Sequence, residues 1–259
     1  MGDLHITEHV ADIGPRLAPL PRLTEGEVHI WKLRPEPAIE FSHYFQILSS
    51  DEQERARRFR FPDLTRKFIV DHGRMRLLLG AYTQTSPEDL VFAQNNFGKP
   101  QLTNHRLRFN LSHTDGLTLL ALCLDSEVGV DVEAVRPMDD WAGIARSNFS
   151  PLENAALHST VETDRQNAFF RCWTRKEAFL KANGHGLSKP LDSFAVSLAP
   201  EELPELLSCE WDSQEMSRWF LVSLPLGPSF VGALAIQRRD WNIRSFDWIA
   251  PGDTLIAQE

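Results

Sequence analysis

The two halves of this chain repeat one order of local patterns, and that repetition constrains the fold more than any other feature. Phenylalanine, serine and glycine at relative positions 0, 3 and 7 occur from Phe109 and again, 111 residues later, from Phe220. A Lys-Pro pair and, before it, a long predicted helix precede each of these hairpins. Hairpins in general resemble one another, but the shared order favours a duplicated α+β unit. Two similar α+β halves would form a pseudo-dimer with the active site in the cleft between them.

Hydrophobic periodicity and turn residues place the individual elements. Strands are predicted at 28–33, 109–112, 117–124, 128–132, 193–198, 219–224 and 230–237, and helices at 53–59, 64–84 and 164–182. The expected organisation is an N-terminal extension (1–24), an N-terminal half (25–127), a C-terminal half (128–250) and a C-terminal tail (251–259).

Asp131 and Glu133 carry the sharpest chemical signal. They alternate with Val128, Val130 and Val132 in a predicted strand, so both carboxylates project from one face while the valines face a core. Two adjacent carboxylates repel each other, and a hard cation such as Mg²⁺ relieves that repulsion. When this motif is taken alone, an exposed strand face with two solvated acids explains it slightly better.

A second signal lies on the longest predicted helix. Trp173, Glu177 and Lys181 are spaced at i, i+4 and i+8 and share a face, which Phe170 extends. An ordinary Glu–Lys pair beside a buried tryptophan would give the same pattern. The aromatic stripe predicts that Glu177 is partly buried, where a role as third metal ligand would explain it and Lys181 would keep it ionised.

Anion-binding side chains are also present. Ser112 and His113 stand at a strand end, where a hydroxyl, an imidazole and turn amides can hold a phosphate. Such a pair is common in turns, and no Gly-x-Ser-x-Gly elbow surrounds Ser112 to favour a hydrolase triad. Five arginines and one lysine lie within residues 55–67, and Lys99 lies in a stiff turn.

Composition excludes several classes of protein. The chain has 27 Lys and Arg against 36 Asp and Glu, a net charge of −9, which disfavours a general nucleic-acid binder. The longest apolar runs, 117–124 and 230–236, are too short to cross a membrane. The three cysteines are sparse and widely spaced, and the N-terminus lacks an apolar signal core. We therefore expect a cytoplasmic protein with reduced thiols.

Five motifs in one order resemble the 4′-phosphopantetheinyl transferases, most closely their larger, surfactin-synthetase-activating type. The signature pair is Gly129-Val130-Asp131-Val132-Glu133 and the helix segment 173–181 with its central Lys-Glu-Ala. The segments 97–100, 109–113 and 186–194 are similar to the family's other blocks. The resemblance spans about residues 55–236.

The resemblance implies a single-chain pseudo-dimer that acts as a monomer. It implies transfer of the phosphopantetheine arm of coenzyme A to a serine of an apo acyl or peptidyl carrier protein, with adenosine 3′,5′-bisphosphate as the other product. It also implies Mg²⁺, with Mn²⁺ as an alternative, on residues that match Asp131, Glu133 and Glu177. Glu177 would also deprotonate the serine, Lys181 would bind phosphate and stabilise developing charge, and Lys176 would lie near the pyrophosphate.

The family's coenzyme contacts match further residues. Ser112 and His113 resemble phosphate contacts, with His113 near the 3′-phosphate. Arg55 and Lys99 match cationic coenzyme-binding positions.

The chain also departs from the family pattern at two positions. Glu52 stands where some relatives have a lysine for the 3′-phosphate, so Arg55 or Arg58 would supply that contact. Lys67 replaces a small hydroxyl residue of some relatives. Glu153 resembles a further acidic residue near the site, with no role assigned.

Two other functions use the same residues. A metal-dependent phosphohydrolase would use the carboxylates to deliver water to a coenzyme A-like pyrophosphate, and it would consume coenzyme A without a carrier. A catalytically silent binding module of the same fold would bind without turnover, although the presence of all three carboxylates and Lys181 argues against decay of the site.

Overall fold

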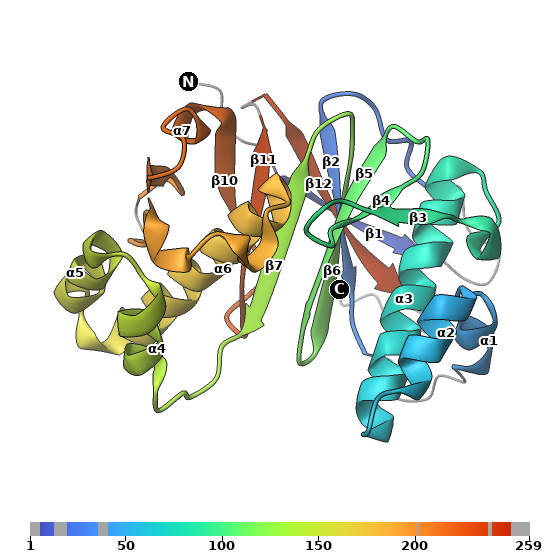
Figure 1. Ribbon diagram of the computed structural model, residues 1–259, viewed down its shortest axis with the longest axis horizontal. Coiled ribbons are helices and arrows are strands. Elements are labelled where there is room, and N and C mark those ends of the chain that lie inside the picture. The colour runs from blue at the N-terminus through green and yellow to red at the C-terminus, as the bar shows by residue number, and fades with distance from the viewer. Residues whose placement is uncertain (1–5, 13–19, 36–40, 201, 238–239, 250–259) are drawn as a thin grey trace, which may run out of the picture.

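The computed structural model describes residues 6–12, 20–35, 41–200, 202–237 and 240–249. Its strands form two main sheets (Figure 1). The first has the order β1 (Ile6–Asp12), β12 (Asn242–Ile249), β2 (Glu27–Leu33), β6 (Leu117–Leu124) and β5 (Leu107–Thr114). The second has the order β10 (Trp219–Leu224), β11 (Phe230–Gln237) and β7 (Val128–Ala134). Two short hairpins add β3 (Phe92–Gln94) with β4 (Pro100–Leu102) and β8 (Phe194–Val196) with β9 (Leu206–Cys209).

One long helix lies over each main sheet, as Figure 1 shows. Helix α3 (Pro62–Thr83) packs Met75, Leu78 and Leu79 into the core of the first half, and α6 (Arg165–Asn183) packs against β7 and β11 of the second. The shorter helices are α1 (Ser42–Gln46), α2 (Ser50–Arg57), α4 (Trp141–Asn148), α5 (Pro151–Ser159) and α7 (Glu215–Arg218). Single 3₁₀ turns lie at Pro87–Asp89, Glu162–Asp164, Gly186–Ser188 and Leu191–Ser193.

The two halves share a hydrophobic core between the sheets. Strands β2 and β6 contribute one side of it, and β7, β10 and β11 contribute the other. The alternating valines Val128, Val130 and Val132 are fully buried there, as their spacing predicted. The α+β fold with two similar halves is therefore confirmed, and β7 lies at their junction.

The chain ends differ from the expected organisation. Strand β12, expected in the C-terminal half, lies between β1 and β2 of the first sheet and runs parallel to both. It crosses over because Ile243 fills the core between the sheets while Phe246 and Trp248 join the core under α3. Part of the expected N-terminal extension, residues 6–12, forms edge strand β1. The expected tail 251–259 lies outside the described residues.

The predicted interior elements agree closely with the structure. Strands β6, β10 and β11 have the predicted bounds, and the long helices α3 and α6 begin and end within two residues of theirs. The repeated helix, sheet and hairpin are therefore confirmed as elements of both halves.

Candidate functional site

Helix α6 lies directly on the face of β7 that carries the carboxylates. Gly129 makes this possible, because a Cβ at that position would lie 2.1 Å from the carbonyl oxygen of Ala178 and 2.3 Å from the amide nitrogen of Ala182. Residues 129, 131 and 133 alternate with the buried valines, so Asp131 and Glu133 share the face that meets α6. Because Gly129 has no side chain, the strand motif at 129–133 and the helix motif at 173–181 can lie in direct contact.

Asp131 is the centre of the polar cluster that results. Its Oδ1 accepts hydrogen bonds from Lys181 Nζ at 2.6 Å and from Ser112 Oγ at 2.8 Å, and Lys181 Nζ lies 2.9 Å from Ser112 Oγ. Asp131 is buried, with 4% of its surface exposed. Ser112 lies on β5, which belongs to the other half. The structure thus joins three predicted site residues from β5, β7 and α6 at the junction of the halves.

Two further carboxylates surround Asp131. Desolvation raises the pKa of Glu133, and the negative charge of Asp131 raises it further. The positive charge of Lys181 opposes both effects. The same two causes raise the pKa of Glu177, and the positive charge of Lys181 offsets only part of this rise. Lys181 favours the ionised form of Glu177 through its charge, as expected, but its direct hydrogen bonds go to Asp131 and Ser112.

The donor set fits a hard divalent cation. Asp131 Oδ2 is buried and has no hydrogen-bond partner in the described part of the chain, and Glu133 and Glu177 each interact electrostatically with Asp131. Within residues that the structure describes, no three His, Cys, Asp or Glu side chains form a preassembled metal cluster. In this structure, Asp131 forms an ion pair with the ammonium of Lys181.

The predicted phosphate-binding histidine is close to this cluster. His113 follows Ser112 on β5 and is exposed. Desolvation lowers its pKa, and the nearby cations Lys67 and Lys181 lower it further, while Asp71 opposes them. A neutral imidazole at neutral pH, near two ammonium groups, is suited to accept or donate a hydrogen bond beside an anion.

Three further residues were predicted to contact coenzyme A. The Arg55 guanidinium lies 5.2 Å from the centre of the Phe68 ring, and Arg58 is exposed and paired with Glu54. Lys99 was expected to contact coenzyme A, but its Nζ bonds to Glu127 and to two backbone carbonyls of the C-terminal half, and its side chain is only 8% exposed. These bonds join the turn that carries Lys99 to the C-terminal half.

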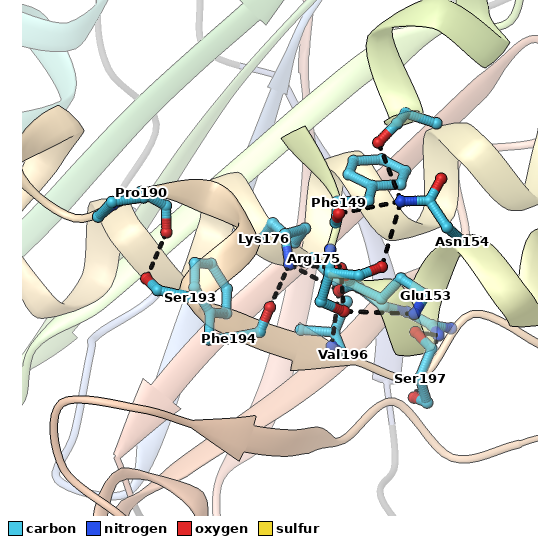
Figure 2. Close-up of polar contacts among 12 residues, drawn as sticks. Phe149, Glu153, Asn154, Arg175, Lys176, Pro190, Ser193, Phe194, Val196 and Ser197 are labelled. Carbon is cyan, nitrogen blue, oxygen red and sulfur yellow. Dashed lines mark hydrogen bonds and ion pairs between the residues drawn. The ribbon is translucent and has the colours of Figure 1, made fainter. Parts of the chain in front are cut away.

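Lys176 does not reach the carboxylates, contrary to the expectation of a pyrophosphate contact. It is fully buried on another face of α6, where Nζ contacts both carboxylate oxygens of Glu153 at 2.7 Å and the carbonyl of Phe194 at 2.6 Å (Figure 2). Glu153 also completes a capping box with Ser150 and accepts the amide of Val196. This ion pair holds α5, α6 and β8 together, so neither residue is available to coenzyme A.

The N-terminal half contains the same arrangement. Ser49 caps α2 in a capping box with Glu52, and Arg76 of α3 bonds to Glu52 at 2.6 Å and to the carbonyl of Leu90. The Arg76 guanidinium lies over the ring of Phe92. In the same way, the Lys176 ammonium lies over the ring of Phe194. The duplication therefore extends to a buried cation held by a capping-box glutamate.

The buried pair in the N-terminal half gives a stability prediction. Hydrogen bonds from His72 and the helix cap, with the charge of Arg76, overcome desolvation and lower the pKa of Glu52 to about 2. A lowered pKa stabilises the fold above the usual value of 4.5, and this stability is lost as the pH falls toward 2. The Glu52 side chain is 15% exposed, so solvent screens part of this interaction, and we expect Glu52→Gln to lower the free energy of unfolding by about 2 kcal/mol at pH 7.

Urea unfolding of both proteins at pH 7 and pH 3.5 checks this. The difference between them should shrink by about 1 kcal/mol at the lower pH. Glu54→Gln is the matched control, because Glu54 lies on the same helix in an exposed pair with Arg58 and should change stability little. An equal loss at both pH values would assign the effect to packing instead.

The chain was compared with known protein families and with curated proteins. Residues 127–235 match the model of the 4′-phosphopantetheinyl transferase superfamily, and residues 31–124 match that of the 4′-phosphopantetheinyl transferase N-terminal domain. The chain is 36% identical over 224 residues to 4′-phosphopantetheinyl transferase HetI of Nostoc sp., covering 85% of this chain and 91% of that protein. It is 29% identical to 4′-phosphopantetheinyl transferase Sfp of Bacillus subtilis, covering 68% of this chain and 80% of that protein.

The chain therefore belongs to the 4′-phosphopantetheinyl transferase superfamily, and the predicted family is confirmed. The two matched segments correspond to its two halves and meet between Leu124 and Glu127, just before β7. No helix in the described residues combines the length and apolar character that a bilayer crossing requires.

Proposed function

We propose that this enzyme transfers 4′-phosphopantetheine from coenzyme A to a serine of an apo acyl or peptidyl carrier protein. The observation that carries the proposal is the cluster of Asp131, Lys181 and Ser112 at the junction of the two halves, with Glu133 and Glu177 beside it. Such a cluster offers both carboxylates and a cation where a pyrophosphate would lie. Family membership supports the same reaction.

The reaction is a phosphoryl-type transfer. The serine oxygen attacks the phosphorus that bears the pantetheine arm, and the bond from this phosphorus to the bridging oxygen breaks. Adenosine 3′,5′-bisphosphate leaves with the bridging oxygen, and the serine proton must pass to a base. Placement of the nucleophile and neutralisation of charge on the leaving group supply most of the catalysis in such reactions.

Each residue has a proposed part in this reaction. Glu177 accepts the serine proton, and burial together with the charge of Asp131 raises the pKa of its carboxyl, which makes it a stronger base. Lys181 stabilises charge on the phosphate oxygens, and Ser112 and His113 hold phosphate groups. Asp131, together with Glu133 and Glu177, would hold Mg²⁺, or Mn²⁺ in its place, which when bound neutralises pyrophosphate charge.

The remaining contacts are proposed more broadly. We place Arg55 and Arg58 on the coenzyme A side of the site, where their positive charge favours an anionic ligand. We also propose that the enzyme acts as a monomer in the cytoplasm.

Release of adenosine 3′,5′-bisphosphate distinguishes transfer from hydrolysis. The enzyme is incubated with coenzyme A and Mg²⁺, with and without an apo carrier protein. Nucleotide release that requires the carrier supports transfer. Equal release without the carrier would indicate a phosphohydrolase, and coenzyme A binding without release in either mixture would indicate a silent binding module.

A further inference from the structure

Two sheet edges from different halves face each other at the site. Strand β5 is the edge of the five-stranded sheet, and β7 is the edge of the three-stranded sheet. Edge strands carry backbone N–H and C=O groups that have no partner within their own sheet. A buried N–H group without a hydrogen-bond partner costs free energy. The hydrogen bonds that link β5 to β7 therefore determine how the two halves are aligned.

Side chains of β5 bond to the backbone of β7. Asn110 Oδ1 accepts the amide of Val130 at 2.8 Å, and Thr114 Oγ1 accepts the amide of Ala134 at 3.1 Å. Both pairs are 20 residues apart in sequence, so the two contacts follow one constant register along the strands. Asn110 and Thr114 lie four residues apart in β5 and therefore point to the same side.

The contact between Ser112 and Asp131 lies between these two bonds. Ser112 shares the face of Asn110 and Thr114, and its hydroxyl bonds to Asp131 at 2.8 Å. Thr114 also lies beside the second carboxylate, with its hydroxyl 3.5 Å from Glu133 Oε2. Its carbonyl accepts Lys67 Nζ at 2.8 Å, which fixes the strand end to α3.

We propose that Asn110 and Thr114 are positioning residues that hold β7 in register against β5. Their side chains replace a backbone ladder between the halves and keep Asp131 opposite Ser112 and Lys181. Register matters because a shift of one residue along a strand would turn the carboxylates to the opposite face. Neither residue needs to touch a substrate for this role, and its kinetic consequence rests on the proposed function.

The test compares Thr114→Val with Thr114→Ser. Valine keeps the shape but lacks the acceptor for the Ala134 amide, whereas serine keeps the hydroxyl. Site-resolved hydrogen exchange should show the Ala134 amide exchanging about 5–10-fold faster in Thr114→Val and within about twofold of wild type in Thr114→Ser. With an apo carrier, kcat should fall about tenfold in the valine variant and recover with serine, while the KM for coenzyme A changes less than about twofold.

Ser197→Ala is the matched control. The Ser197 hydroxyl also accepts a backbone amide, that of Glu205, but in a loop of the C-terminal half away from β7. This variant should lose stability without a selective change at Ala134 or in kcat. The proposal is overturned if Ala134 exchanges at the wild-type rate in Thr114→Val, or if valine and serine lower kcat equally. Because exchange needs no substrate, it tests the positioning role even if no transfer occurs.

Discussion

Asp131→Asn should fold normally and yet transfer phosphopantetheine about a thousandfold or more slowly than the wild type. Asparagine keeps the shape and the oxygen that accepts Lys181 and Ser112 at 2.6 and 2.8 Å. It removes the charge on which a cation at the pyrophosphate would depend. Turnover with saturating coenzyme A and an apo carrier measures the loss.

Asp125→Asn is the control for this substitution. Asp125 is an exposed aspartate whose pKa is lowered by Arg106, outside the candidate site, so its neutralisation should leave turnover unchanged. Near-wild-type transfer by folded Asp131→Asn would remove Asp131 from the reaction. A loss that excess Mg²⁺ fully reverses would restrict its role to metal affinity.

Glu177→Gln separates two proposed roles of Glu177, those of proton acceptor and of metal ligand. Glutamine keeps an oxygen but loses the basicity that the raised pKa of the carboxyl provides. If Glu177 is the base, transfer should fall by about two to four decades while coenzyme A affinity changes little. The rate is measured against Mg²⁺ concentration for both proteins with one apo carrier.

The Mg²⁺ dependence decides between the roles. A rate defect that persists at saturating Mg²⁺ supports the base, whereas full rescue by metal refutes it and leaves a ligand. Unchanged kinetics at every Mg²⁺ concentration would exclude Glu177 from the site. The pH profile provides a second check, because a raised pKa predicts that the wild-type rate falls as the pH drops through it.

Local periodicity predicted the core of the site. Strand alternation placed Asp131 and Glu133 on the same face of a strand, and helical spacing placed Glu177 and Lys181 on the same face of a helix. Both patterns depend only on backbone geometry. Lys176 was assigned to the site by resemblance alone. Its helical position, about 100° from Glu177, already pointed it elsewhere.

Other features required knowledge of contacts between distant segments. The capping boxes of Glu52 and Glu153 have a sequence signal, a serine three residues before each glutamate, but their buried cations lie 24 and 23 residues further along the chain. Strand β12 resembles any short amphipathic strand, and only packing decides which sheet it joins. The Asn110 and Thr114 bonds could be suspected from their alternation around Ser112, but their partners belong to the other half.

The intact mass of an apo carrier protein after incubation with enzyme, coenzyme A and Mg²⁺ tests the proposed function most directly. Several carriers are compared, each beside a variant whose acceptor serine is replaced by alanine. Transfer predicts that a recognised carrier gains the mass of one phosphopantetheine and that its alanine variant gains none. Coenzyme A consumed while every carrier keeps its original mass would contradict the transferase function.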